Sequence, residues 1–254
     1  MSEAILKRID HDHFLELRFS QPNRRNPMDQ ETARLFQENL KLLASEQGDR
    51  CRPLVIRGEE GTFSAGGDFG FLKERKNFSL EENEATMLAF YNSFLSVLDY
   101  PGIVVAFIEG AAIGAGLCLA MACDEIWVEG KAKLALNFLK LGINPGMAAL
   151  PLARERLGIS IANDVLISGE RFSGEDFYDW GGANRLFQES SEAWIELESA
   201  LKAYPNSRFA VAPIKSERKE CLQLEGCLKI EAKGQALCYH SSAFESWIKK
   251  MESK

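Results

Sequence analysis

The chain has 254 residues, of which 46% are hydrophobic and 26% are charged, and its formal net charge at pH 7 is −7. This length and apolar content are enough for one large folded domain, and they exclude a largely disordered chain. The negative net charge argues against a general nucleic-acid-binding surface, although a local basic patch could still hold a phosphate group.

Cysteine and histidine content argues against a metal centre. The six cysteines form no CxxC pair, and there are only three histidines, so we expect no zinc site and no metal. Cys118 and Cys123 lie in an apolar stretch, where cysteine usually acts as a small hydrophobic residue. The N-terminal segment is charged and no apolar run approaches 18 residues. We therefore expect a cytoplasmic protein that does not enter the membrane.

The first hundred residues alternate between strand and helix patterns. Ile5–Ile9 and Phe14–Phe19 are predicted as two strands around a turn, and an amphipathic helix begins at Met28–Asp29. Leu54–Arg57 is predicted as a short strand. Leu80–Tyr100 is predicted as a helix whose aromatic stripe, which includes Tyr91, packs in the core.

The central stretch begins with a continuous apolar run, Ile103–Ile108, which is typical of a strand buried on both faces. Gly110, Gly114 and Gly116 follow, and a run of small and apolar residues then predicts a helix buried on nearly every side. The first N–H groups of a helix lack partners, and its dipole adds positive charge there. The start of this helix is therefore suited to hold an anion or a polarised oxygen.

Three ligand classes, or none, could use such a turn. Leu119 stands where a dinucleotide-binding motif requires its third glycine, and no Lys-Ser/Thr pair follows as a nucleoside triphosphate would require. An oxyanion hole for a thioester or enolate remains, beside the simple alternative of close helix–strand packing.

The rest of the chain is mostly helical. Strands are predicted at Glu125–Val128 and Lys133–Leu136, and a short helix at Phe172–Trp180. The other predicted helices cover Met147–Leu157, which Gly158 ends, Ser160–Ser168, and 192–253 with a break at Tyr204–Asn206. The order is that of an α/β fold followed by an α-helical region, which we divide into a core, residues 1–195, and a C-terminal helical region, residues 196–254.

A second glycine-rich turn follows the strand Leu54–Arg57. Its sequence Phe63–Asp68 (FSAGGD), together with Ala111–Glu125 (AAIGAGLCLAMACDE), resembles the two signature segments of the enoyl-CoA hydratase/isomerase (crotonase) superfamily. The resemblance extends from about Ile5 to the C-terminal helices. It implies a ββα spiral core whose C-terminal helices build a homotrimer or a dimer of trimers.

The resemblance also implies an oxyanion hole. By position, the backbone N–H groups of Gly67 and Ala115 would polarise an acyl-thioester carbonyl, and Ala65, Asn137 and Phe138 would lie around the acyl group. Coenzyme A or phosphopantetheine would be part of the substrate and no separate cofactor is expected. The partner would be an acyl-CoA or an acyl carrier protein.

The usual acid–base residues of the superfamily's hydratases are missing. Their two glutamates map to Cys118 and Phe138, neither of which can hold or activate water, so ordinary hydration is not expected. The usual isomerase acid also maps to Phe138, which argues against simple double-bond migration. Cys118 instead counts among the residues expected to contact substrate.

Asn137–Met147 (NFLKLGINPGM) resembles a branch of the superfamily found in polyketide β-branching, whose members decarboxylate a glutaconyl-type group. A lysine used by that branch maps to Arg75, which Lys73 and Lys76 flank. These three residues would bind the substrate carboxylate, or they form a solvated charged turn.

A histidine used by the same branch maps to Gln235, and His240 follows five residues later. His240 is therefore a candidate proton donor, or an ordinary surface histidine. Arg24 and Arg25 lie in a loop that, in the superfamily, passes the nucleotide end of coenzyme A. They could hold phosphate oxygens, or they are solvated loop arginines.

The sequence thus predicts an enzyme that acts on an acyl thioester through an enolate, with decarboxylation as the preferred reaction. One alternative is an atypical hydratase or isomerase with a displaced acid. Another is a non-catalytic protein that binds acyl thioesters.

Overall fold

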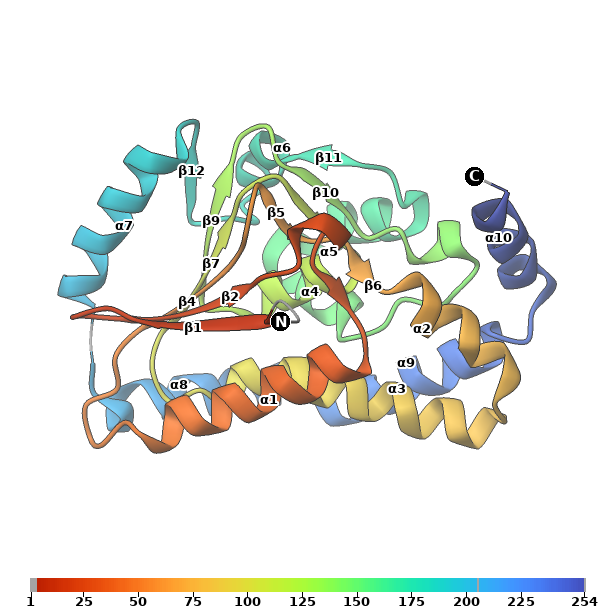
Figure 1. Cartoon of the computed structure of the whole chain (residues 1–254), viewed down its shortest axis with the longest axis horizontal. Coiled ribbons are helices and arrows are strands. Elements are labelled where there is room, and N and C mark those ends of the chain that lie inside the picture. Colours follow the sequence, from red (N-terminus) through yellow and green to blue (C-terminus); the bar gives the residue numbers. More distant parts are fainter. Residues whose placement is uncertain (1–3, 205, 254) are drawn as a thin grey trace.

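The computed structural model describes residues 4–204 and 206–253 (Figure 1). Short strands and helices alternate as far as residue 187, and only helices follow. The predicted class, an α/β fold followed by an α-helical C-terminal region, is therefore confirmed. Within the described residues, no helix is long and apolar enough to cross a membrane.

The larger sheet has six strands in the spatial order β1-β2-β4-β7-β9-β12. Its strands are β1 (Leu6–Asp10), β2 (Leu15–Phe19), β4 (Leu54–Gly58), β7 (Val104–Ile108), β9 (Glu125–Glu129) and β12 (Arg185–Phe187). Only β1 and β2 pair antiparallel, and all the other neighbours are parallel. Every residue of β7 is buried, as expected for a central strand covered on both faces.

Two smaller sheets carry the glycine-rich turns. The four-stranded sheet has the order β11-β10-β8-β5, and the two-stranded sheet pairs β3 with β6. Their strands are β3 (Pro27–Met28), β5 (Thr62–Ser64), β6 (Gly66–Gly67), β8 (Ala111–Ile113), β10 (Lys133–Ala135) and β11 (Phe172–Ser173). Parallel pairing of β5 with β8 brings the two turns together, although the turns lie far apart in the sequence.

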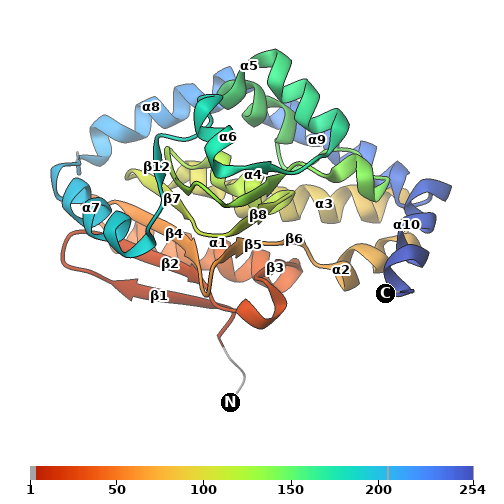
Figure 2. The ribbon, with the colours of Figure 1, turned by 90° about the horizontal axis from the view of Figure 1, so that it is seen from above.

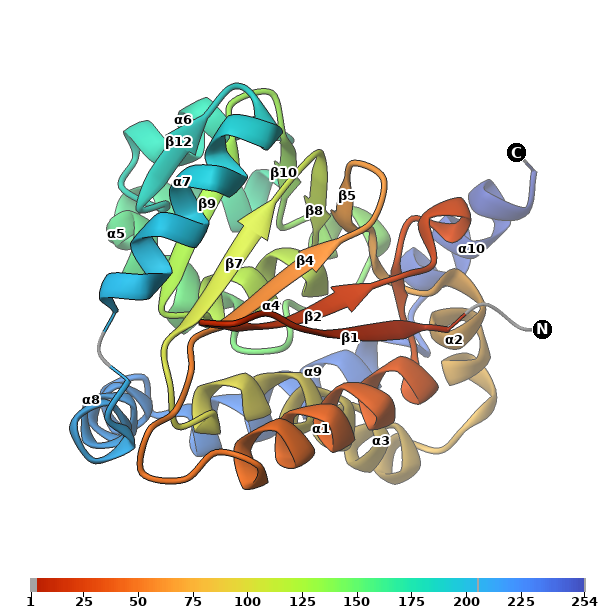
Figure 3. The same ribbon diagram turned by 60° about the vertical axis from the view of Figure 1, so that its left-hand side comes forward.

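Helices cover both faces of the six-stranded sheet. They are α1 (Gln30–Ser45), α2 (Phe69–Glu74), α3 (Leu80–Leu95), α4 (Ala115–Ala122), α5 (Ala149–Ser168), α6 (Gly174–Asp179), α7 (Ser190–Ala203), α8 (Arg208–Cys221), α9 (Leu224–Cys238) and α10 (Ser242–Glu252). Helix α7 packs on one face, against Phe107 and Trp127. Figures 1 and 3 show α1, α3 and α9 side by side below the strands, on the side of the larger core.

Most local predictions are confirmed, and the differences have physical causes. Asp29 caps α1, and Gly158 interrupts α5 with φ 72°, which ends the first of the two predicted helices. The helix predicted to reach Tyr100 ends at Leu95 and continues as a 3-10 turn. The chain breaks between α7 and α8 as predicted; Pro205, inside that break, lies outside the described residues. Strand β12 was not predicted, because three residues give too short a pattern.

Helix α4 is buried along its whole length, so its terminal polar groups need partners inside the protein. Two arginines supply them at its C-terminal end. Arg218 donates to the carbonyl oxygens of Ala122 at 2.9 Å and Met121 at 3.0 Å. Arg156 donates to Met121 O at 3.3 Å and also to Cys123 O. Their positive charges also oppose the negative end of the helix dipole.

The C-terminal helices are tied to the core by a buried ion pair. Lys215 of α8 is 4% exposed, and its Nζ lies 2.9 Å from Asp124 Oδ2 and 3.1 Å from Gly102 O. The same Asp124 oxygen accepts the N–H of Val104, the first residue of β7, at 2.7 Å. Helix α8 is thus fixed to the start of the central strand. At the other end of the region, α10 lies beside α2 (Figure 2), and Phe69 packs on Trp247.

Replacing Arg218 with methionine tests the role of the arginines at the end of α4. Arg218→Met leaves the Ala122 carbonyl without a donor and Glu155 without its ion-pair partner, so we expect the free energy of unfolding to fall by about 2–4 kcal/mol in urea denaturation. Arg34→Met is the matched control. Arg34 pairs with Glu38 on the surface of α1, and its loss should change stability by less than about 0.5 kcal/mol. Equal effects of the two substitutions would contradict this role.

Candidate active site

The first glycine-rich turn joins β5 to β6 and rests against the second. Gly66 has φ 83°, a conformation that residues with a side chain rarely adopt. A Cβ atom there would lie 2.4 Å from Ile113 O and 3.5 Å from the Ala115 nitrogen. Likewise, a Cβ at Gly116 would lie 2.8 Å from the Ser64 Cβ. The glycines are therefore needed because the two turns touch backbone to backbone.

The second turn leads from β8 into α4. Gly114 has φ 53°, and its N–H donates to Ala135 O at 2.8 Å. Ala115 is the first residue of α4, so no carbonyl of the helix can accept its N–H. Among the described residues, no other acceptor for this N–H is found. Ala115 therefore presents a free donor at the positive end of a buried helix dipole.

Gly67 and Ala115 line the same cavity, which has a volume of about 60 Å³. Ala65, Asn137 and Phe138 line it too. The structure thus brings together five of the residues predicted to contact substrate, around one hollow. That the two N–H groups bind a carbonyl oxygen stays a prediction.

The cavity walls come from segments distant in the sequence. Helices α2 and α3, the 3-10 turn Phe138–Leu141, the loop that precedes α5, and α9 all contribute. Within residues 4–204 and 206–253, the cavity lining contains no Asp, Glu, His, Lys or Arg. In the same part of the chain, no three His, Cys, Asp or Glu side chains form a group that could hold a metal ion. The polar side chains in the lining are those of Tyr91, Asn137 and Gln235.

Gln235 is fixed by hydrogen bonds, whereas the Tyr91 hydroxyl makes none with the described residues. The Gln235 amide donates to Asn144 O at 2.7 Å, and its oxygen accepts the Tyr239 hydroxyl at 2.9 Å. Tyr91 is 1% exposed, and its hydroxyl has no hydrogen-bond partner among the described residues. Burial raises the pKa of Tyr91 well above its usual value, so the phenol is neutral. The aromatic stripe of the predicted helix assigned Tyr91 only a role in the core. No signal in the sequence distinguished it from the other residues of that stripe.

Two candidate residues lie outside the cavity. His240 follows the end of α9, where its side chain is exposed, so the expectation that it could face the substrate is not met. Gln235 lies on the cavity side of α9, and five residues do not complete a whole number of helical turns. Cys118 is fully buried below the lining, with its Sγ 3.7 Å from Gly146 O. Burial also raises the pKa of the Cys118 thiol well above its usual value.

The three basic residues after the first turn also point elsewhere. Arg75 is 5% exposed, and its guanidinium lies 4.3 Å from the Phe78 ring centre and 5.0 Å from that of Phe71. It is thus behind Phe71, which lines the cavity. Lys73 Nζ forms an ion pair with Glu252 of α10 at 2.6 Å, and Lys76 is exposed. The expected contact of these residues with a substrate carboxylate in the cavity is therefore not met.

Arg24 and Arg25 lie next to the first turn, on its exposed side. The Arg24 guanidinium is 2.8 Å from Asp68 Oδ2, and the Arg25 carbonyl accepts the N–H of Ala65 at 2.9 Å. Asp68 follows Gly67 directly and caps α2 through Phe71 N–H at 3.0 Å, which is a structural role. Both arginine side chains are exposed, so the predicted contact with phosphate groups stays sterically open.

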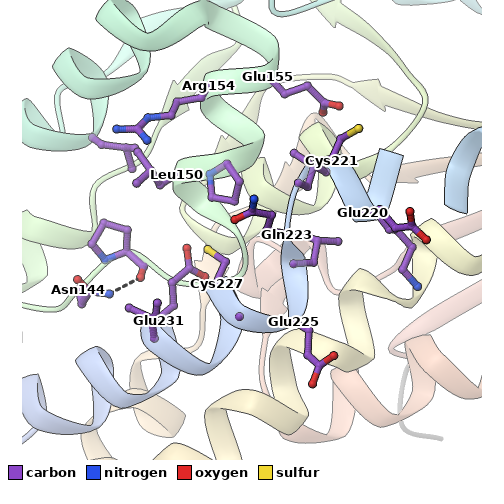
Figure 4. A pocket seen from close by; sticks show the side chains of 18 of the residues that line it. Asn144, Leu150, Arg154, Glu155, Glu220, Cys221, Gln223, Glu225, Cys227 and Glu231 are labelled. Carbon is purple, nitrogen blue, oxygen red and sulfur yellow. Dashed lines mark hydrogen bonds between the residues drawn. The ribbon is translucent and has the colours of Figure 1, made fainter. Parts of the chain in front are cut away.

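A second, larger hollow of about 1350 Å³ is lined by residues from α5, α8 and α9 (Figure 4). Neither glycine-rich turn contributes to its lining. Glu231 lines this hollow and is 5% exposed; its Oε2 accepts the N–H of Ala148 at 2.7 Å. Burial raises the pKa of Glu231 to about 7, although the backbone N–H groups at the start of α5 oppose the shift. Glu231 therefore fixes the loop that ends in Met147, which lines the smaller cavity.

The buried carboxyl of Glu231 makes stability depend on pH. Its pKa rises from an ordinary 4.5 to about 7 on folding, so the folded chain binds more protons than the unfolded chain between these values. The free energy of unfolding should then fall as pH rises through this window. Glu231→Gln keeps an acceptor for Ala148, removes this dependence, and should stabilise the protein at pH 8 by up to about 3 kcal/mol.

Denaturant titrations between pH 5 and pH 8 measure this effect. Glu225→Gln is the control on the same helix, because Glu225 is exposed and pairs only with Lys229. It should leave the pH profile of stability unchanged in that range. A Glu231→Gln profile parallel to that of the unsubstituted protein would contradict the assignment.

Comparison with known proteins gives the family. The sequence model described as enoyl-CoA hydratase/isomerase matches residues 11–246. A Thermus thermophilus protein provisionally named as an enoyl-CoA hydratase is 30% identical over 202 residues, which cover 78% of this chain and 79% of that protein.

Two solved structures share the fold. The crystal structure of enoyl-CoA hydratase from Bacillus halodurans matches with a TM-score of 0.87 at 20% identity, over 97% of this chain and 100% of that one. A structure from a dehydratase/decarboxylase enzyme couple involved in polyketide β-branching matches with a TM-score of 0.82, also at 20% identity, over 99% and 100%. The predicted crotonase-like architecture is confirmed, and trimer formation stays a prediction.

Proposed function

Because the chain belongs to the enoyl-CoA hydratase/isomerase family, we propose that it is an enzyme that decarboxylates a glutaconyl-type acyl thioester through an enolate. The observation that carries the proposal is the cavity of Gly67 and Ala115, in whose lining the described residues include no charged side chain. A free N–H at a helix start suits the oxygen of an enolate. The lack of acid–base groups disfavours reactions that need them.

Hydration would require a group that holds and activates water within hydrogen-bond reach. Phe138 lines the cavity at the position where the resemblance places a hydratase glutamate, and Cys118 is buried behind it. Tyr91 and Cys118 have pKa values raised by burial, so neither is a base near neutral pH. These features support loss of CO₂ over addition of water.

In the proposed reaction, the bond between the substrate's carboxyl carbon and its neighbouring carbon breaks, and CO₂ leaves. The electron pair enters a dienolate, whose negative charge reaches the thioester oxygen beside the N–H groups of Gly67 and Ala115. A proton from water then adds to carbon and the hydroxide returns to the solvent, since the described lining holds no Asp, Glu, His, Lys or Arg that could donate the proton. An apolar cavity favours the loss of CO₂, because it solvates the substrate carboxylate poorly.

The thioester carrier would be coenzyme A or the phosphopantetheine of an acyl carrier protein, and no other cofactor is proposed. Arg24 and Arg25 are exposed beside the first turn, where either phosphate group could reach them. The family resemblance further suggests a trimer, which would leave the cavity residues of each chain in place.

A substrate panel tests the proposed reaction. Purified protein should release CO₂ from 3-methylglutaconyl-CoA or from the corresponding carrier-protein thioester, and should not hydrate crotonyl-CoA measurably. Hydration or double-bond migration without CO₂ release would contradict the proposal and favour an atypical hydratase or isomerase. Binding of thioesters without any turnover would instead indicate a non-catalytic binding protein.

Two substitutions at one position test the oxyanion donor. Proline is tolerated at the first residue of a helix, so Ala115→Pro should fold while lacking the N–H. Turnover should fall by about 10²–10³-fold, as expected when one oxyanion donor is lost. Ala115→Gly retains the N–H and should lose no more than a few-fold. Full activity of a folded Ala115→Pro protein would show that the donor is a different group.

A further inference from the structure

The wall of the cavity carries a hydrogen-bond donor without a partner among the described residues. Tyr91 lies on α3, and its hydroxyl is buried without a partner among the described residues, although the residue lines the cavity. A buried hydroxyl that makes no hydrogen bond costs stability. Buried tyrosine hydroxyl groups usually find a partner, so an unpartnered one in a cavity wall points to a ligand.

Gly146 makes room for this donor. A Cβ atom at Gly146 would lie 2.3 Å from the Tyr91 hydroxyl oxygen and 2.6 Å from Gln235 Nε2. Both polar atoms therefore converge on the backbone of Gly146, which also lines the cavity. Gln235 is fixed by Asn144 and Tyr239, and one of its two N–H groups is used in the bond to Asn144 O.

The remaining lining near Tyr91 is apolar. Phe71, Leu72, Met87 and Phe90 also line the cavity, so a polar acyl group would find few other partners there. The small volume of about 60 Å³ favours a short acyl group. The cavity thus combines a short apolar channel with a neutral hydrogen-bond donor.

We propose that Tyr91 is a substrate-binding residue whose hydroxyl donates a hydrogen bond to a carboxylate on a short acyl group. The inference rests on the proposed function, since it places a dicarboxylic acyl thioester in the same cavity. Tyr91 would fix the carboxylate orientation without the positive charge of a lysine. A neutral donor holds the carboxylate less strongly than an ion pair would, so it opposes CO₂ loss less.

Binding of unreactive thioesters to Tyr91→Phe tests this role without any turnover. Glutaryl-CoA carries the carboxylate, and 5-methylhexanoyl-CoA carries an isopropyl group of similar shape in its place. Calorimetry should show that Tyr91→Phe weakens glutaryl-CoA binding by tenfold or more, while it changes 5-methylhexanoyl-CoA binding by less than about twofold. An equal change for both ligands, or no change for either, would overturn the inference.

Tyr100→Phe is the matched control, because it removes another buried hydroxyl that donates to Arg52 O at 2.8 Å and does not line the cavity. Glutaryl-CoA and 5-methylhexanoyl-CoA should each bind Tyr100→Phe as tightly as they bind the unsubstituted protein. The Tm should fall in Tyr100→Phe and should not fall in Tyr91→Phe, whose hydroxyl has no partner in the fold. A lower Tm or loss of folding in Tyr91→Phe would assign the hydroxyl to the fold and overturn the inference.

These outcomes separate the inference from the proposed reaction. Selective weakening of glutaryl-CoA binding without CO₂ release in the substrate panel would support the role of Tyr91 and contradict the decarboxylase assignment. CO₂ release by the unsubstituted protein, with unchanged glutaryl-CoA binding in Tyr91→Phe, would support the decarboxylase assignment and contradict the role of Tyr91. Failure of the unsubstituted protein to bind either thioester would overturn both.

Discussion

The structure depends on one buried helix whose two ends must be satisfied inside the protein. Helix α4 is out of contact with solvent, so its free carbonyl groups and N–H groups cannot bind bulk water. Arg156 and Arg218 satisfy the carbonyl end. At the other end, the cavity takes the place of a partner, so Ala115 N–H remains available to a ligand. The same requirement that gives the arginines a structural role leaves a donor at the opposite end for the proposed site.

Local features of this arrangement could be predicted from the sequence because they depend on short-range chemistry. A glycine ends the first part of α5, an aspartate caps α1, and an apolar run forms the central strand. The two glycine turns could be paired as one site because the resemblance joined them. Close contact of Gly66 with Ile113 and Ala115 explains why both turns need glycine, which spacing alone did not reveal.

The side chains that α2, α3 and α9 contribute to the cavity could not be predicted, because tertiary packing selects them. Tyr91 packs in the core with the rest of its aromatic stripe, and the absence of a side chain at Gly146 leaves room for its hydroxyl in the cavity wall. Arg75 was expected near substrate because it maps to a lysine of the resembling branch, yet its guanidinium lies over the rings of Phe71 and Phe78. His240 was selected by residue type, but helix rotation places Gln235 at the cavity instead.

The distribution of charge along the cavity favours the proposed reaction over its competitors. During CO₂ loss, negative charge leaves the carboxylate and moves toward the thioester oxygen. In the proposed reaction, Ala115 at the positive end of α4 would stabilise the charge where it arrives, and a described lining without charged side chains would strengthen the effect of these partial charges. A cation near the carboxylate would hold the charge where it begins. The basic residues Lys73, Arg75 and Lys76 lie outside the lining, so the field of α4 is not opposed from within the cavity.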